Sequence, residues 1–294
     1  MTSSKAIVLG QPTTTNAGLR RGFEDLGFDA AVVSPLDSTD VGLGDLVLAR
    51  IDVLPTVDGV EPGLSRLPAL AAEGACVFNG AVTLLGAHDK LLTASLLARA
   101  GVPQPRSSHL ACPSLPRGLR PPYVVKPRFG SWGRDVVRCD SDVELLAWLH
   151  RIEERRWFQR HGALVQELLP ATGVDLRLVV AAGRVVGAVE RIARPGEWRT
   201  NVALGATRRP VVPPREARAL ALRAMAALSL DLGGVDLLRD RSGQLVVLEV
   251  NGAVDFDETY GADVYAAAAA ALASTAFVAP AANELDAVRV VAAV

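Results

Sequence analysis

Two acidic residues interrupt a pair of apolar, strand-like runs late in the chain. Residues 235–239 and 244–251 are rich in Val and Leu, and the Asp-Arg-Ser-Gly sequence between them, residues 240–243, is typical of a hairpin loop. Pairing the two residues that flank this loop places Asp236 opposite Val247. We therefore expect an antiparallel hairpin that carries a carboxylate inside a strand otherwise suited to burial.

Alternation of side chains along a strand predicts which groups of this hairpin lie together. Glu249 and Asn251 project from the same face as Val247, so Asp236, Glu249 and Asn251 are expected to converge. Two carboxylates and an amide oxygen suit Mg²⁺, with Mn²⁺ as an alternative, better than Zn²⁺ or copper. The competing interpretation is a solvated hairpin face, although burial of two like charges without a cation is costly. The opposite face is expected to meet a core through Val246, Leu248 and Val250.

The composition excludes several classes of protein. Half of the 294 residues are apolar and 21% are charged, which allows a normal globular core. Lys and Arg number 31 against 32 Asp and Glu, and this net charge of −1 argues against general nucleic-acid or membrane-surface binding. Cys76, Cys112 and Cys139 form no C-x-x-C pair, which favours a reducing cytoplasm. Residues 6–9 are too short an apolar run for a signal peptide, and the uncharged, alanine-rich residues 264–282 favour a packed helix over a membrane span.

The order of predicted elements divides the chain into three parts. Residues 1–87 form an α/β domain that opens with a strand–helix–strand unit, residues 88–165 a small α+β module, and residues 166–294 a third module. The opening unit lacks G-x-G-x-x-G, so a Rossmann-type NAD-dependent oxidoreductase is only a weak alternative. Further strands are expected at residues 45–49, 75–78, 123–126, 136–138, 163–168, 176–181 and 184–191. Helices are expected at residues 16–26, 88–100, 142–159 and 215–228, with a Pro-rich connector over residues 103–122.

A lysine at the end of an apolar strand precedes a glycine-punctuated loop. Lys126 is followed by Pro-Arg-Phe and then by the loop residues Gly130, Ser131, Trp132, Gly133 and Arg134. A cation beside backbone N–H groups that can approach anionic oxygens is what a polyphosphate site needs. An ordinary hairpin with a snorkelling lysine is the alternative, and Lys90 taken alone would be a surface residue of a helix.

These features belong to a longer series of short motifs that is more specific than its parts. The series is His-Asp-Lys-Leu at 88–91, Val-Lys-Pro at 125–127, Gly-Ser-Trp-Gly-Arg at 130–134, Val-Gln-Glu at 165–167, Asp-Leu-Arg at 175–177, Glu-Arg at 190–191, Arg-Thr-Asn at 199–201, Gly-Val-Asp at 234–236 and Glu-Val-Asn at 249–251. Together they resemble the ATP-grasp superfamily over nearly the whole chain. Within it they resemble the carboxylate-amine ligases typified by ribosomal protein S6 glutamate ligase (RimK) and the lysine-biosynthesis enzyme LysX.

The resemblance implies an α/β (α+β) ATP-grasp fold with a Rossmann-like pre-ATP-grasp domain, a small lid and a C-terminal mixed-sheet domain, and it implies ATP and Mg²⁺ as cofactors. Matches to the family's nucleotide-contacting positions are Lys90 and Lys126 for the phosphates, Gly130 to Arg134 for the mobile loop, Glu167 and Leu168 for the adenine edge, and Asp175. Matches to its phosphate end are Arg191, Arg199, Thr200 and Asn201. Asp236, Glu249 and Asn251 match its metal ligands.

The reaction that the resemblance implies is ADP-forming amide synthesis. A substrate carboxylate takes the γ-phosphoryl group of ATP to give an acyl phosphate, and an amine then displaces phosphate. Because phosphoryl transfer depends on charge neutralisation rather than on a side-chain nucleophile, the candidates for steadying the reacting groups are Arg177, Arg191, Arg199 and Asn201. Each arginine can instead belong to a structural ion pair. A nucleotide-binding module without turnover is a further alternative.

Departures from the family pattern bear on substrate choice. Leu204 replaces an arginine expected after Asn201, which removes a contact to a substrate carboxylate. The acceptor is an amino acid or another amine, and the carboxylate belongs to a small molecule, a peptide or a carrier protein. The resemblance favours a homodimer or homotetramer, with no nucleic-acid or membrane partner. We expect Glu249→Ala or Asp236→Ala to abolish phosphate release and leave the fold intact. A basic run that either attracts an acidic carrier or is solvated surface contains Arg208, Arg209, Arg215 and Arg218.

Overall fold

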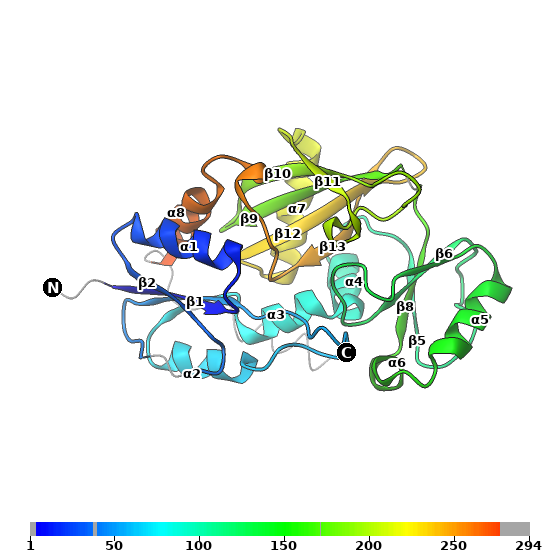
Figure 1. Ribbon diagram of the computed structural model, residues 1–294, viewed down its shortest axis with the longest axis horizontal. Coiled ribbons are helices and arrows are strands. Elements are labelled where there is room, and N and C mark those ends of the chain that lie inside the picture. The colour runs from blue at the N-terminus through cyan, green and yellow to red at the C-terminus, as the bar shows by residue number, and fades with distance from the viewer. Residues whose placement is uncertain (1–3, 38–39, 171, 277–294) are drawn as a thin grey trace.

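The strands of the described part of the chain form three separate sheets (Figure 1). A computed structural model describes residues 4–37, 40–170 and 172–276. The N-terminal sheet lies within residues 5–78, the middle sheet within residues 107–167 and the C-terminal sheet within residues 174–251. Strand β8 of the middle sheet extends two residues beyond the expected division at residue 165, and the three domain boundaries stay predictions.

The N-terminal sheet is parallel, in the order β2-β1-β3-β4. Helix α1 (Thr14–Glu24) links its first two strands, so the expected strand–helix–strand opening is confirmed. The helix begins after Thr13, whose side chain accepts a hydrogen bond from the Asn16 N–H and so satisfies a free helix-end donor. The other elements of this region are β1 (Lys5–Gly10), β2 (Asp29–Val33), β3 (Leu46–Arg50), η1 (Leu64–Arg66), α2 (Leu67–Ala72) and β4 (Cys76–Phe78).

The middle sheet is antiparallel and consists of β5 (Ser107–Leu110), β8 (Ala163–Glu167), β6 (Tyr123–Pro127) and β7 (Val137–Cys139), in that order. Strand β5 lies inside the segment expected to be a connector. The single helix expected over residues 142–159 is wrong: α5 (Asp142–Ile152) and α6 (Arg156–His161) are separated by an extended Arg155 at ψ 133°. The break turns Trp157 and Phe158 into the same core as the buried leucines of α5.

The C-terminal sheet is antiparallel and buried on both faces. Leu178 and Val180 of β9 pack in one core with α7 (Arg215–Leu228) and with residues of α3 (Ala81–His88) and α4 (Lys90–Arg99). Val179 and Ala181 pack in another core with α8 (Val264–Ala276). Helix α7 has the bounds that its apolar periodicity predicts. The strands, in sheet order, are β11 (Thr207–Pro210), β10 (Arg184–Ile192), β9 (Val174–Ala181), β12 (Leu232–Arg239) and β13 (Leu245–Asn251), with η2 (Val202–Leu204) and η3 (Glu258–Tyr260) outside the sheet.

The expected register of the β12–β13 hairpin is wrong. Arg239 pairs with Leu245, and the N–H of Asp240 donates to the Gln244 carbonyl, so the loop is longer than expected. A bulge then follows, because Leu237 pairs with Val247 while Asp236 pairs with Glu249. The two carboxylates are therefore direct cross-strand neighbours. Val247 instead packs in the core that Leu248 was expected to enter, and Leu248 lines a cavity beside Glu249.

Helix α8 joins the C-terminal part of the chain to the N-terminal domain. It packs along α1, and the core that holds it contains strand residues of both the N-terminal and the C-terminal sheets. Its described part ends at residue 276, so the end of the helix expected over residues 264–282 lies outside the described residues. Among the helices of residues 4–276 that the structure describes, none has the length and apolar character that a membrane span requires.

Candidate functional site

Two adjoining cavities lie beside the glycine loop of residues 130–134. The first lies where the middle and C-terminal sheets meet, and the second is lined by Asp52 and His88 together with residues of the glycine loop and of the C-terminal part of the chain. The first cavity has a volume of about 110 Å³ and the second about 290 Å³. The residues that line both are Ser131, Trp132, Arg191, Asn201 and Glu249. Those of our predicted site that line only the first are Lys90, Lys126, Gly130, Gly133, Arg134, Glu167, Leu168, Asp175, Arg199, Thr200 and Asp236, and those that line only the second are Arg177 and Asn251.

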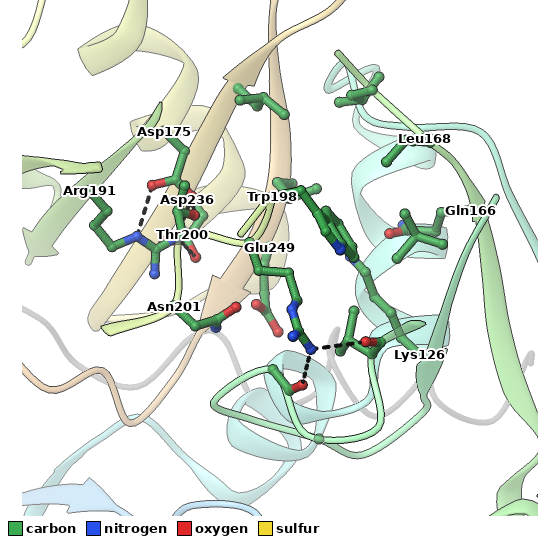
Figure 2. A pocket seen from close by; sticks show the side chains of 18 of the residues that line it. Lys126, Gln166, Leu168, Asp175, Arg191, Trp198, Thr200, Asn201, Asp236 and Glu249 are labelled. Atoms are coloured by element: carbon green, nitrogen blue, oxygen red, sulfur yellow. Dashed lines mark hydrogen bonds and ion pairs between the residues drawn. The ribbon is translucent and has the colours of Figure 1, made fainter. Parts of the chain in front are cut away.

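The structure thus brings every predicted site residue to one cavity or the other. In Figure 2, Asp175, Arg191 and Asp236 lie to one side of the first cavity, and Lys126 lies to the other. Glu249 lies between them in this view. The first side comes from β9, β10 and β12, and the second from β6. Since these strands belong to two different sheets, the cavity is formed where two parts of the fold face each other.

The two predicted lysines differ in how they are paired. Lys90 is the first residue of α4, and its ammonium group donates to the Gly130 carbonyl and to the Glu249 carboxylate, each at 2.6 Å. Lys126 is half-buried on β6, and its ammonium group has no hydrogen bond or ion pair within the part of the chain that the structure describes. Burial, aided by the nearby Lys90 charge, lowers the pKa of Lys126 to about 8 against the opposing effect of Glu249. An anion in this cavity would relieve that penalty.

Asp89 fixes the position of Lys90. Its side chain accepts hydrogen bonds from the N–H groups of Leu91 and Leu92 and so caps α4. The same carboxylate forms a two-bond ion pair with Arg128, with N–O distances of 2.7 and 2.6 Å. This pair ties the helix start to the segment that follows β6, and it brings both predicted lysines to the same cavity.

Asp236 is the centre of a buried charge cluster. Arg177 donates two hydrogen bonds of 2.6 Å to its carboxylate, and Arg191 donates a third of 2.8 Å. Arg191 also bonds Asp175, whose carboxylate accepts from Thr200. Sheet register explains the cluster, because Arg177 is the cross-strand partner of Asp236 and Arg191 that of Asp175. Burial raises the pKa of Asp236, but the two guanidinium groups outweigh it and hold that pKa at about 2.

The glycine loop is held from two directions. Arg134 donates to the Pro55 carbonyl of the N-terminal domain at 2.8 Å, and its guanidinium lies 4.6 Å from the centre of the Trp132 ring. Arg199 donates to the carbonyl groups of Gly133 and Val136. Gly133 has φ 71°, and a Cβ there would lie 2.8 Å from the Asn201 side-chain oxygen, so the loop requires glycine at this position.

The arrangement described so far has counterparts among known proteins. A family model for the RimK-like ATP-grasp domain matches residues 87–272. The chain belongs to the RimK-like ATP-grasp family. A protein of Serratia proteamaculans (strain 568) named "Probable alpha-L-glutamate ligase" is 36% identical over 228 residues, which cover 75% of this chain and 73% of that protein.

Two solved structures share the fold. The RimK domain ATP-grasp protein of Sphaerobacter thermophilus DSM 20745 superposes with a TM-score of 0.64 at 22% identity and covers 92% of this chain and 98% of its own. The ATP-grasp ligase PsnB, complexed with a minimal precursor, Mg and ADP, gives 0.66 at 19% identity, with 92% and 98% covered. The expected ATP-grasp fold is confirmed. The protein is an ATP-dependent ligase that forms C–N bonds with release of ADP, and the oxidoreductase alternative is wrong.

The segment that was expected to contact the adenine edge has only part of its backbone free. The N–H of Glu167 already donates to the Arg106 carbonyl and that of Leu168 to the Pro122 carbonyl, each at 3.0 Å. Of the backbone groups of these two residues, only the carbonyl groups are therefore free to bind a ligand. The backbone hydrogen bonds of the described residues do not include one from the amide of Leu169, which also lines the first cavity.

Our sequence reasoning missed several residues that line the first cavity. Gln166 has a buried side-chain oxygen that lacks a hydrogen-bond partner among the described residues, and Trp198 presents an indole ring (Figure 2). Leu238 could have been found, because it lies two residues from Asp236 and so shares its strand face. Leu248 could not have been found, because the bulge moves its side chain to the opposite face of the strand. The residues missed are Val124, Gln166, Leu169, Trp198, Leu238 and Leu248, among others.

The predicted metal ligands form a strip along the hairpin. Asp236 and Glu249 are cross-strand partners, and Asn251 pairs with Gly234 two residues further along β13. The Asn251 amide nitrogen is buried without a partner among the described residues. Within the described ranges, no group of three or more His, Cys, Asp or Glu side chains is placed to hold a metal. The set is nevertheless all-oxygen and anionic, which fits Mg²⁺ that shares its coordination with phosphate oxygens.

Proposed function

We propose that the first cavity binds ATP and that the second binds the carboxylate and the amine that this ligase joins. The observation that carries this assignment is that Glu249 and Arg191 line both cavities. A phosphoryl group that is transferred from a nucleotide in the first cavity to a substrate in the second must pass the residues that line both cavities. These residues include the guanidinium group of Arg191 and the carboxylate of Glu249. The reacting phosphoryl group would therefore lie beside Glu249, with the adenine at the Leu168 end.

Each part of the first cavity has a role in this proposal. Lys126, whose charge is buried without a partner among the described residues, pairs with the phosphates, and Lys90 adds a second cation beside it. The glycine loop covers the phosphates and excludes water. The carbonyl of Glu167 accepts from the adenine amino group, and the amide of Leu169 donates to the ring. Trp198 and Leu248 supply apolar walls.

We also propose Asp236, Glu249 and Asn251 as the residues that hold Mg²⁺, or Mn²⁺ in its place. The bound ion would neutralise phosphate charge during the transfer. The chemistry of the three oxygen donors supports this assignment, as does the Mg and ADP complex of PsnB, a ligase of the same fold. Asp236 is already neutralised by Arg177 and Arg191, so Glu249 and Asn251 have the more available oxygens.

For the substrates, we propose that the acceptor is an amino acid, L-glutamate being the first candidate, and that the carboxylate belongs to a small molecule, a peptide or a carrier protein. The name of the Serratia relative supports glutamate. Leu204, which stands where the family pattern has an arginine, packs against the glycine loop, with a methyl group 3.3 Å from where a Gly133 Cβ would lie. A cytoplasmic homodimer or homotetramer without nucleic-acid or membrane partners completes the proposal, and the net charge of −1 supports the last point.

The test is a coupled assay with ATP, MgCl₂, L-glutamate and a panel of glutamate-terminated peptides and small dicarboxylic acids. We expect ADP and phosphate in equal amounts, and only when amine and carboxylate are both present. Lys126→Met, which keeps the length of the side chain and removes its charge, should lower the rate about 100-fold. If ATP with Mg²⁺ stabilises the protein but no pair of the panel yields ADP, the proposed substrates are wrong.

A further inference from the structure

One wall of the second cavity contains a histidine with one free ring nitrogen. His88 is 6% exposed, and its Nε2 lies 2.7 Å from the Ile51 carbonyl oxygen. A carbonyl can only accept, so Nε2 carries the hydrogen. Burial lowers the pKa of His88 to about 4, so the ring is neutral at pH 7 and Nδ1 carries a lone pair. This nitrogen can only accept a hydrogen bond.

A second acceptor lies close to that lone pair. The Asp52 side-chain oxygen Oδ1 lies 3.9 Å from His88 Nδ1. The backbone of Asp52 is fixed, because its N–H donates to Glu61 and its carbonyl accepts from the Glu61 N–H. Two acceptors at this distance cannot bond each other, whereas a donor with several hydrogens placed against them can bond both.

A third acceptor lies on the same cavity. The Asp255 side chain is 57% exposed, and its one ion pair among the described residues is a 3.4 Å contact with Arg50. Burial, and the Asp255 charge after it, raise the pKa of Asp52 to about 6. At neutral pH the wall therefore carries two carboxylates and a neutral imidazole, and these groups favour a cation.

The cations around this wall already have partners. Arg50 donates through Nε and Nη2 to Asn16, Val254 and Asp255, and its Nη1 alone is without a partner among the described residues. Lys90 donates to Gly130 and Glu249. The guanidinium groups that line the same cavity are paired with carboxylates: Arg177 with Asp236, Arg191 with Asp175 and Asp236, and Arg208 with Asp257. Within the described ranges neither a lysine nor an arginine forms an ion pair with Asp52, and the His88 ring beside it is neutral.

We propose that Asp52 and Nδ1 of His88, assisted by Asp255, bind the ammonium group of the amine substrate. An ammonium group has three N–H donors and a positive charge, which match two carboxylates and one bare ring nitrogen in a cavity. The site therefore selects amines that are protonated at neutral pH, such as an α-amino acid. This inference rests on the proposed function of the second cavity and identifies the end of that cavity where the acceptor enters.

The test compares two nucleophiles in one variant. Asp52→Asn keeps an acceptor for the Val53 N–H, which donates to Asp52 at 2.7 Å, and removes the negative charge. L-glutamate has an ammonium group, whereas hydroxylamine is uncharged at neutral pH and traps the acyl phosphate as a hydroxamate. We expect the KM for L-glutamate to rise about 10- to 100-fold. The KM for ATP and the rate of hydroxamate formation should stay within about twofold of the wild type, because neither depends on ammonium binding.

Asp29→Asn is the matched control, since it makes the same change on an exposed residue of the same domain and lines neither cavity. An unchanged KM for L-glutamate in Asp52→Asn would overturn the inference. So would an equal loss with glutamate and hydroxylamine, which indicates a structural role. A wild-type protein that forms neither amide nor hydroxamate with any carboxylate of the panel overturns the proposed function and this inference together. An active wild-type protein whose KM for L-glutamate does not change in Asp52→Asn overturns this inference alone.

Discussion

The ammonium group of Lys90 lies 2.6 Å from the Glu249 carboxylate and joins the start of α4 to strand β13. Lys90 also donates to the Gly130 carbonyl, so one side chain connects the glycine loop with the residue that lines both cavities. A cation that enters beside Glu249 competes with Lys90 for the same oxygen. Loop position, lysine position and metal binding are therefore coupled through this contact.

Glu249→Gln tests that coupling. The amide keeps the shape of the side chain but loses the charge that attracts Lys90 and a metal ion. We expect phosphate release to fall at least about 100-fold, and the Mg²⁺ concentration for half-maximal activity to rise. The side chain is 25% exposed and Lys90 keeps its bond to Gly130, so the free energy of unfolding should change by less than about 1 kcal/mol. Glu216→Gln, on an exposed ion pair with Arg239, is the control, and near-normal turnover of Glu249→Gln would contradict the proposed site.

Asp236→Asn should behave differently, which revises our expectation that loss of Asp236 leaves the fold intact. The carboxylate is 2% exposed and neutralises both Arg177 and Arg191. Removing its charge leaves buried guanidinium groups without full compensation, which costs about 3 kcal/mol or more. Urea unfolding measures the loss. Asp257→Asn, which breaks the more exposed pair with Arg208, should cost less than about 1 kcal/mol. Equal stability of the two variants would refute a structural role for the Asp236 cluster.

The hairpin that carries Asp236 and Glu249 also shows where sequence reasoning succeeds and where it fails. Apolar periodicity depends on local spacing, and it predicts helix 215–228 at both ends. The hairpin register depends on a five-residue spacing between Arg239 and Leu245 and on a bulge at Leu248, which the alternation pattern does not reveal. The pairing of Arg177 with Asp236 requires knowing that β9 lies beside β12. Motif order predicted which residues meet at the site, whereas Trp198, Asp52 and His88 needed the tertiary fold.

The pair of Asp52 and His88 predicts how stability depends on pH. The folded-state pKa of His88 is lowered from 6.5 to about 4, so the unfolded chain binds more protons between these values and stability falls as pH drops through that window. The pKa of Asp52 is raised from 3.8 to about 6, so its folded form binds more protons and stability rises as pH drops through 6 to 3.8. The two contributions largely cancel in the wild-type protein.

The substitution Asp52→Asn removes the contribution of Asp52 to this pH dependence and leaves that of His88. The free energy of unfolding of this variant should fall by about 3 kcal/mol more than that of the wild type between pH 7 and pH 4, because the opposing gain from Asp52, whose pKa rises from 3.8 to about 6 on folding, is lost. Urea unfolding at the two pH values measures the difference. Adding His88→Phe to Asp52→Asn should abolish the extra dependence. Parallel pH profiles of the wild type and Asp52→Asn would show that the two groups do not titrate in these windows.

Gly18→Ala tests the contact that holds α8 against the N-terminal domain. A Cβ on Gly18 would lie 2.5 Å from ring carbons of Tyr265, and the Tyr265 hydroxyl donates to the Phe256 carbonyl at 3.0 Å, so the ring cannot move freely. Alanine is the better helix former by about 1 kcal/mol, but overpacking of a buried contact costs about 1–3 kcal/mol. We expect a net loss of about 1 kcal/mol or more in urea unfolding.

Gly42→Ala is the matched control for this substitution. A Cβ at Gly42 would meet no atom within 4 Å, so the free energy of unfolding should stay within about 0.5 kcal/mol of the wild type. Because α8 packs in one core with strand residues of both the N-terminal and the C-terminal sheets, Gly18→Ala should also weaken the hold between those two parts. Faster hydrogen exchange of α8 amides than in the wild type would report that loosening. If Gly18→Ala is as stable as Gly42→Ala, the two helices are not packed as closely as the contact with Tyr265 requires.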